Sequence, residues 1–166
     1  MIRIGLISDT HGYLDPSVAE HFRDCDEIWH AGDIGDVAVI EALEKIKPVV
    51  AVFGNIDDLV MRARFPEDVR LAREGVTLWM THIGGRPPRF NPRVSKVLKE
   101  NQPDVFICGH SHILRVAKEK TFNVLCVNPG AAGNHGFHTM RTILRMEIQD
   151  GRIHKMEAIE LGKRGQ

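Results

Sequence analysis

Aspartate, asparagine and histidine residues recur in this sequence directly after short apolar runs. The first case is Asp9 and His11, two residues apart, which follow the apolar run that begins at Ile2. A carboxylate and an imidazole at this spacing can bind one metal ion, although an N-cap aspartate and a surface histidine would also account for the pair. The same arrangement recurs four more times along the chain. This recurrence, rather than any single pair, indicates metal chemistry.

The most specific local signal is Gly109-His110-Ser111-His112, which follows the apolar run Val105 to Cys108. In an extended loop, side chains two residues apart diverge enough for His110 and His112 to serve two neighbouring ions. A pair of surface histidines is the alternative explanation. The complete set of strand-end candidates is Asp9, His11, Asp33, Asn55, His82, His110 and His112.

These candidate ligands are more than one ion requires, and they suit two divalent ions that share one bridging carboxylate. Mixed nitrogen and oxygen ligands without thiolate favour Mn, Fe or Zn over Ca or Mg. We expect Mn, with Zn, Fe or Ni as the alternatives. A single metal ion would leave several of these residues redundant.

The elements that must position these residues are predicted from hydrophobic patterning. Residues 2–53 alternate between strands and helices, including a helix over Val37 to Ile46, which predicts parallel strands with right-handed crossovers. The carboxyl ends of such strands share one edge, where ligands bind. His30 lies inside a predicted strand and is expected to be a packed histidine rather than a ligand.

The second half of the chain changes character. Glu74-Gly75 and Asp150-Gly151 each separate two apolar runs and predict β-hairpins. We therefore expect an antiparallel second half that forms its own sheet, face to face with the first sheet, with helices outside. A proline after Asn91 predicts one such helix.

The composition predicts a single globular domain over residues 1–166, with 43% hydrophobic and 27% charged residues. Basic and acidic residues number 22 each, which argues against a dedicated nucleic-acid surface. No apolar run approaches the roughly 20 residues needed to span a bilayer, and the N-terminus does not resemble a signal peptide. Three cysteines without a CxxC motif suit a reducing cytoplasm, where we expect the protein to act. A homo-oligomer is left open.

Taken together, the ordered motifs resemble the calcineurin-like metallophosphoesterase superfamily. The start Ser8-Asp9-Thr10-His11-Gly12 and the segment Asn128-Pro129-Gly130 are similar to its compact bacterial and archaeal phosphodiesterase branch. The resemblance implies an α/β fold, a four-layer α/β/β/α sandwich of two mixed β-sheets flanked by helices. It also implies a first metal held by Asp9, His11, Asp33 and His112, and a second held by Asp33, Asn55, His82 and His110.

The activity implied by the resemblance is that of a dinuclear-metal-dependent phosphodiesterase acting on a small phosphoester. A metal-bridging hydroxide attacks phosphorus, with Asp33, Asn55 and His110 in the catalytic centre and no protein nucleophile. Two alternatives are a phosphomonoesterase and a non-catalytic interaction scaffold like the retromer subunit that shares this fold. That subunit departs from the family at ligand positions, whereas every ligand position is intact here.

Substrate contacts are expected from Asn55 and from the loop that follows His82. Arg86 and Arg89 in this loop suit phosphate or carboxylate recognition, although a solvated loop would also account for them. Many family members carry, after the motif asparagine, a histidine thought to protonate the leaving group, and this chain has Ile56 there. His135, in a loop of small residues, could approach the substrate and replace that acid.

Overall fold

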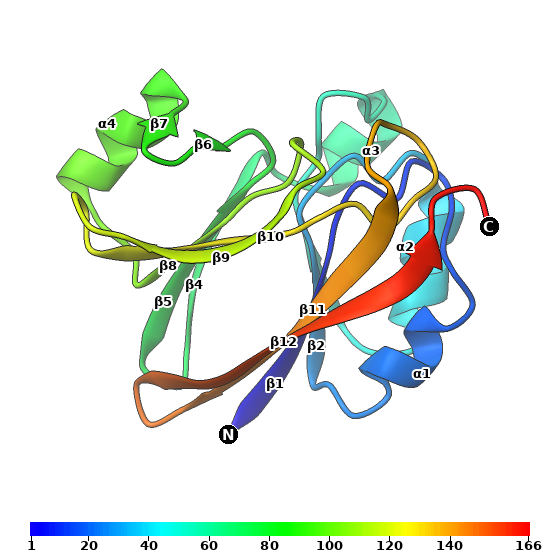
Figure 1. Cartoon of the computed structure of the whole chain (residues 1–166), viewed down its shortest axis with the longest axis horizontal. Coiled ribbons are helices and arrows are strands. Elements are labelled where there is room, and N and C mark those ends of the chain that lie inside the picture. Colours follow the sequence, from blue (N-terminus) through cyan, green and yellow to red (C-terminus); the bar gives the residue numbers. More distant parts are fainter.

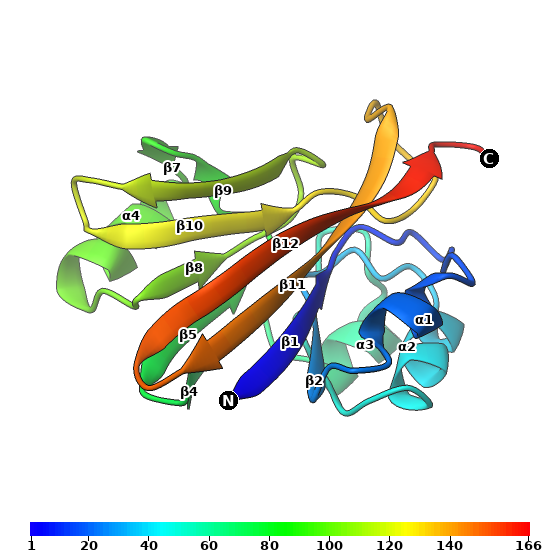
Figure 2. The same ribbon diagram turned by 60° about the horizontal axis from the view of Figure 1, so that its bottom comes forward.

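The computed structural model describes residues 1–166 as two five-stranded β-sheets packed face to face, with a small separate hairpin (Figures 1 and 2). The first sheet has the order β12-β11-β1-β2-β3 and the second the order β4-β5-β8-β10-β9. The strands of the first sheet are β1 (Ile2–Ile7), β2 (Glu27–His30), β3 (Val49–Ala51), β11 (Met140–Gln149) and β12 (Arg152–Lys163). Those of the second are β4 (Asp68–Arg73), β5 (Val76–Thr81), β8 (Val105–Ile107), β9 (Leu114–Glu119) and β10 (Val124–Pro129), and the hairpin consists of β6 (Gly85–Arg86) and β7 (Arg89–Phe90).

Helices cover the outer face of each sheet (Figure 1). Beside the first sheet lie α1 (Val18–Phe22), α2 (Val37–Glu44) and α3 (Leu59–Arg64), and α4 (Pro92–Glu100) covers the second. Three buried apolar clusters fill the three interfaces between these layers: one between the sheets, one beneath α1 and α2, and one beneath α4. The fold is therefore the expected four-layer α/β/β/α sandwich of two mixed sheets.

The hairpin of β11 and β12 corrects one expectation. It pairs antiparallel with β1, so the C-terminal strands complete the first sheet instead of the second. The second sheet is not wholly antiparallel either, because β8 runs parallel to both β5 and β10. A turn such as Asp150-Gly151 specifies a hairpin but not the sheet that it joins. Burial makes that choice here, since Leu144 and Met146 of β11 pack beside Ile4 in the core between the sheets.

The boundaries of the helices agree better with their capping residues than with the extent of their apolar stripes. Asp36 caps α2 by accepting a hydrogen bond from the backbone of Ala38, and the helix ends at Glu44, two residues before the predicted end. Helix α3 is not predicted from the sequence, because Leu59 and Val60 are exposed and form no inward stripe. No helix in the structure has the length and apolar character needed to cross a membrane.

Candidate metal centre

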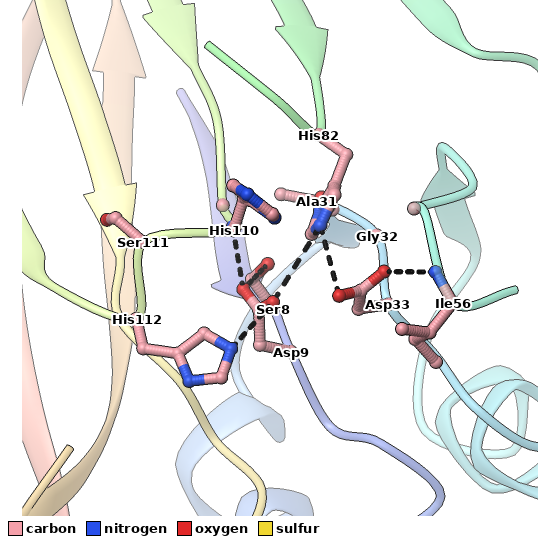
Figure 3. A network of polar contacts seen from close by, with 12 residues as sticks. Ser8, Asp9, Ala31, Gly32, Asp33, Ile56, His82, His110, Ser111 and His112 are labelled. Atoms are coloured by element: carbon pink, nitrogen blue, oxygen red, sulfur yellow. Dashed lines mark hydrogen bonds and ion pairs between the residues drawn. The ribbon is translucent and has the colours of Figure 1, made fainter. Parts of the chain in front are cut away.

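The predicted ligands all lie in loops that follow the carboxyl ends of parallel strands. The two sheets bring these loops to a common edge, where side chains from both sheets face one another (Figure 3). The first sheet contributes Asp9 and His11 after β1, Asp33 after β2 and Asn55 after β3, and the second contributes His82 after β5 and His110 and His112 after β8.

Asp9 is fully buried and has its carboxylate held in one orientation. Its Oδ2 accepts hydrogen bonds from the Ser8 hydroxyl (2.6 Å) and from the backbone N–H of His110 (3.1 Å). Its Oδ1 therefore faces the histidines, with Nε2 of His112 at 3.2 Å and Nε2 of His11 and His82 each at 3.9 Å. One oxygen is used by the protein and the other is free for a ligand.

Asp33 divides its two oxygens in the same way. Its Oδ1 accepts a hydrogen bond from the backbone N–H of Ile56 (3.1 Å), and its Oδ2 lies 3.2 Å from Nε2 of His82 and 3.5 Å from Nε2 of His11 (Figure 3). Burial opposes ionisation of this carboxyl, but the contacts with His82, Ile56 and His11 outweigh it and lower the pKa of Asp33. Its Oδ2 is therefore an anionic acceptor that lies between His82 and His11.

His82 is oriented by a backbone contact behind it. Its Nδ1–H donates to the carbonyl of Ala31 (2.7 Å), which turns Nε2 toward the carboxylates of Asp9 and Asp33. Burial opposes the charge on this ring, but Asp33 and Asp9 together raise its pKa in the metal-free protein. For His11, burial is the dominant cause and lowers the pKa, which favours the neutral ring that binds metals.

Three buried polar atoms at the centre of the site have no hydrogen-bond partner: Asp9 Oδ1, His11 Nε2 and His82 Nε2. An unsatisfied buried group of this kind typically costs about 1–3 kcal/mol. Metal–ligand bonds of about 2.0–2.2 Å hold donor atoms roughly 3 Å apart, close to the shortest nitrogen–oxygen separations here. The donor set, which is carboxylate oxygen and imidazole nitrogen, therefore fits a divalent cation.

The metal-competent side chains separate into two groups. Asp9, His11 and His112 form one, and Asp33, His82 and His110 form the other, with the candidate ligand atoms of each group within 4.8 Å of one another. The ligand sets implied by the family resemblance contain these groups and add Asp33 to the first and Asn55 to the second, and that assignment of ligands stays a prediction. Asn55 lies next to the second group in the same cleft, with an exposed side chain.

Five of the candidate ligands have backbones in the left-handed region. The φ angles are 54° for Asp9, 46° for His11, 55° for Asp33, 68° for His110 and 62° for His112. This region is uncommon for residues other than glycine, and such strain concentrates at functional sites. The surrounding loops must hold it in place, and nothing in the sequence pattern indicates it.

Two glycines next to the ligands allow the loops to approach closely. A Cβ on Gly54 would collide with the Asp33 carboxylate, and a Cβ on Gly109 would collide with the Ser8 hydroxyl and Asp9. The glycines of the Gly54-Asn55 and Gly109-His110 motifs therefore have a steric role, because only a hydrogen fits beside the carboxylates.

Sequence reasoning missed two positioning residues. Asp57 is buried and accepts hydrogen bonds from the backbone N–H groups of Ile34 (3.2 Å), Gly35 (2.9 Å) and Gly54 (2.8 Å), which ties the loop after β2 to the loop after β3. The signal available was its place three residues after Gly54, a spacing at which an aspartate can accept from the backbone of a turn.

Asn128 does the same for the histidine loop of the second sheet. Its Nδ2 donates to the carbonyl of Gly109 and to the hydroxyl of Ser111, both at 3.0 Å, and its Oδ1 accepts from Gly130 N–H at 2.9 Å. The Asn128-Pro129-Gly130 segment thus fixes the loop that carries His110 and His112.

His30 is packed, as expected. Its Nδ1 accepts a hydrogen bond from Gly32 N–H (3.1 Å), which leaves Nε2–H to donate to the hydroxyl of Thr10 (3.0 Å). Thr10 in turn donates to the carbonyl of Ile34 (2.9 Å). Burial lowers the pKa of His30 to about 4, so the ring is neutral near pH 7.

An open cleft of about 510 Å³ lies over the ligands. Ile56 lines it, and so does His135, whose ring stacks on His11 with 4.8 Å between centroids. Neither Arg86 nor Arg89 lines the cleft. They lie on the β6–β7 hairpin, paired across its two strands, and Arg86 lines an adjoining hollow instead.

A two-sheet sandwich with carboxylates and imidazoles gathered at the strand ends defines a candidate metallohydrolase. Residues 2–151 match the calcineurin-like phosphoesterase superfamily domain, and the chain belongs to that superfamily. A probable metallophosphoesterase of Methanocaldococcus jannaschii is 30% identical over 163 residues, covering 95% of this chain and 81% of the relative.

Solved structures show the same fold at lower sequence identity. A predicted phosphoesterase from Streptococcus pneumoniae superposes with a TM-score of 0.71 at 23% identity, covering 96% of this chain and 90% of the other. A Vps29 variant from Entamoeba histolytica gives a TM-score of 0.75 at 16% identity, covering 96% and 99%. These likenesses show the architecture, and the superfamily membership indicates a metal-dependent hydrolase.

Proposed function

We propose that this protein is a phosphodiesterase that works with two divalent metal ions, Mn in preference to Zn, Fe or Ni. One observation carries the proposal: two groups of metal-competent side chains meet at the inward-facing oxygens of Asp9 and Asp33. Buried atoms without partners at this meeting point are explained by bound cations. When bound, two such ions supply an activated water and stabilise negative charge on the phosphoryl group.

The residues of the chain have separable roles in this proposal. Asp33 would be shared by both ions, because its Oδ2 faces both His82 and His11. Asp9, His11 and His112 hold one ion, and Asn55 and His110 complete the ligands of the other. Asn55 also contacts the substrate, since its exposed side chain lines the cleft.

The lining of the cleft supports a diester substrate. It contains no lysine or arginine, so a phosphate must be bound mainly through the metal centre and polar neighbours. Ile56 occupies the cleft wall where an acid would stand and cannot donate a proton. A diester carries one negative charge fewer than a monoester dianion, and an aryl leaving group needs little protonation.

The alternative function is a non-catalytic interaction scaffold, favoured by the structural likeness to Vps29. The intact ligand set argues for the hydrolase, because a scaffold has no need of unsatisfied buried carboxylate and imidazole atoms.

A reducing cytoplasm is the proposed environment. Cys25, Cys108 and Cys126 are all free and buried, and burial raises the pKa of their thiols to about 11, about 12 and about 11. Such thiols are unreactive, and the fold uses no disulfide.

The proposal is tested by metal stoichiometry and substrate choice together. After Mn loading and gel filtration, we expect two ions per chain and a higher kcat/KM for bis(4-nitrophenyl) phosphate than for 4-nitrophenyl phosphate. His112→Ala should lose one ion, whereas His154→Ala, a control on exposed β12, should keep both. Full activity with one ion or fewer per chain would exclude the dinuclear site, and no turnover of either ester would favour the scaffold.

The role of Ile56 predicts a dependence on the leaving group. Wild-type rates on diesters should fall steeply as the leaving-group pKa rises, and Ile56→His should selectively raise the rates on alkyl esters, because general acids typically contribute about 10²–10⁴-fold. Ile113→His, which adds a histidine elsewhere in the cleft, is the matched control. A flat dependence in the wild type, with chemistry rate-limiting, would reveal a proton donor, and His135→Ala would identify it if the dependence then became steep.

A further inference from the structure

Two arginines beside the metal centre have no protein partner. Arginine side chains elsewhere in the protein commonly form ion pairs, as Arg73 does with Glu27 and Arg141 with Asp15. Arg86 and Arg115 form no ion pair or side-chain hydrogen bond, and Nε of Arg115 is buried without an acceptor. A guanidinium with an unsatisfied buried donor indicates a missing anionic or carbonyl acceptor.

Both arginines line the same hollow on the α4 side of the second sheet. Arg86 reaches it from the β6–β7 hairpin and Arg115 from the edge strand β9. Figure 1 shows the hairpin on the same side of this sheet as α4. Two positive charges that are almost thirty positions apart in the sequence therefore lie at one hollow. The sequence pattern around each arginine does not indicate this.

The hollow adjoins the metal cleft. Ser111 and Ile113 line both, and Ser111 lies between the ligands His110 and His112 (Figure 3). A ligand whose phosphate sits at the metal centre can extend past Ser111 and Ile113 toward the two guanidinium groups. The cleft itself offers no lysine or arginine, and the adjoining hollow supplies two guanidinium groups without protein partners. Another neighbouring hollow contains Arg62 and Arg93, but both are already hydrogen-bonded to protein acceptors.

No carboxylate forms an ion pair with either arginine. Arg115 also lines a second, shallower hollow with Lys118, Lys120 and Glu119. The Glu119 carboxylate is already engaged by the backbone N–H groups of Thr121 (3.0 Å) and Phe122 (2.8 Å). The carboxylate therefore makes its hydrogen bonds within its own turn and forms no ion pair with Arg115.

We propose that Arg86 and Arg115 form an anion-binding subsite that holds a second phosphate group of the substrate, beyond the phosphate that is cleaved. This inference rests on the proposed phosphodiesterase function and narrows its substrate to diesters that carry a further phosphate. Guanidinium groups bind phosphate through paired, charge-assisted hydrogen bonds, which gives such a subsite both affinity and geometry.

Two matched probes test the subsite. Thymidine 5′-(4-nitrophenyl phosphate) and the same compound with a 3′-phosphate share the scissile bond and leaving group and differ by one phosphate. The wild type should prefer the 3′-phosphorylated probe, and Arg86→Gln/Arg115→Gln should lower kcat/KM for it by about 10- to 100-fold while changing the other probe less than twofold. Arg152→Gln, which removes an unpaired arginine on β12, should change neither.

A binding measurement keeps the subsite separate from catalysis. By calorimetry with Mn present, thymidine 3′,5′-bisphosphate should bind the wild type more tightly than thymidine 5′-monophosphate, and the double variant should lose this difference. The single variant Arg115→Lys, which keeps the positive charge, should retain part of this difference in affinity. Equal losses on both probes, or an unchanged preference for the bisphosphate, would overturn the subsite. If neither probe is hydrolysed, the proposed phosphodiesterase function fails, and the calorimetry still decides whether the anion subsite exists.

Discussion

Asp9 and Asp33 each give one carboxylate oxygen to the protein and keep the other for the site. Ser8 and the backbone of His110 hold Asp9, and the backbone of Ile56 holds Asp33. Each carboxylate is thereby fixed in orientation before a ligand arrives, which lowers the entropic cost of binding. The chemistry of the site depends on these few fixed atoms.

Asp33 and Asn55 should respond differently to substitution. Asp33→Asn removes the charge proposed to bridge both ions, whereas Asn55→Ala removes one neutral ligand of one ion. We expect Asp33→Asn to lose both ions and at least tenfold more turnover than Asn55→Ala, which should keep the ion held by Asp9, His11 and His112. Metal content by elemental analysis and kcat with a diester provide the comparison, and equal losses in the two variants would contradict the bridging assignment.

At the scale of elements, the site depends on contacts between neighbouring loops. Asp57 joins the loops after β2 and β3 through three backbone N–H groups, and Asn128 anchors the loop after β8. Such contacts hold the left-handed ligand residues in place. Strands supply the positions of the ligands, and these buried polar side chains supply the precision.

Replacing Asp57 should weaken metal binding without removing a ligand. In Asp57→Asn the amide cannot accept all three hydrogen bonds equally well, so we expect about 10- to 100-fold weaker Mn affinity, as for other residues that orient ligands. Asp58→Asn is the control, because asparagine caps a helix about as well as aspartate does. Titration with Mn measures both, and an unchanged affinity in Asp57→Asn would exclude the positioning role.

His30 makes the stability of β2 and its loop sensitive to pH. Its pKa is about 4 in the folded protein and about 6.5 when unfolded, because burial disfavours the charged ring. Protonation of Nδ1 would also set it against Gly32 N–H. Below pH 6.5 the unfolded chain gains a proton that the folded protein lacks, so this contribution is complete above 6.5 and is lost as pH falls toward 4.

His30→Gln should therefore cost more stability at pH 7 than at pH 4.5. As the pH falls from 7 to 4, the free energy of unfolding of the wild type should decrease by on the order of 3 kcal/mol more than that of the variant. Urea unfolding of the metal-free proteins measures the difference, and the other histidines cancel because both proteins contain them. A difference between the two proteins that does not change with pH would contradict this account.

At the scale of the whole molecule, the candidate metal centre spans the two sheets. Asp9, His11, Asp33 and Asn55 come from the first sheet, and His82, His110 and His112 from the second. Bound ions would therefore join the two halves of the sandwich at the edge where the inner core ends.

Removal of the metal should lower the thermal stability of the entire fold. A ligand at about one hundred times its Kd stabilises a protein by about 2.7 kcal/mol, which corresponds to roughly 5–10 °C for a chain of this size. Calorimetry before and after chelation should show this drop, and Mn should reverse it. His112→Ala should show a smaller drop, and a Tm indifferent to chelation in the wild type would contradict metal bridging of the sheets.

The sequence by itself determined most strands of the two large sheets, their hairpin turns and the residues at the strand ends, whereas the short β6–β7 hairpin lies in a segment expected to be a loop. These features are local: apolar periodicity, glycine and a polar side chain lie within a few residues of one another, as in Gly109-His110-Ser111-His112. The family motifs share this local character, and for that reason the superfamily and the four-layer sandwich could be predicted.

The tertiary structure alone decided which distant segments meet. The sheet joined by β11 and β12 depended on which apolar faces could be buried together, and the hydrogen bond from His110 to Asp9 joins residues 101 positions apart. Helix α3, the role of Asp57 and the meeting of Arg86 with Arg115 have the same origin. Hydrophobic periodicity specifies which face of an element is buried but not its partner, because packing, close approach and polar satisfaction are settled only when the whole chain folds.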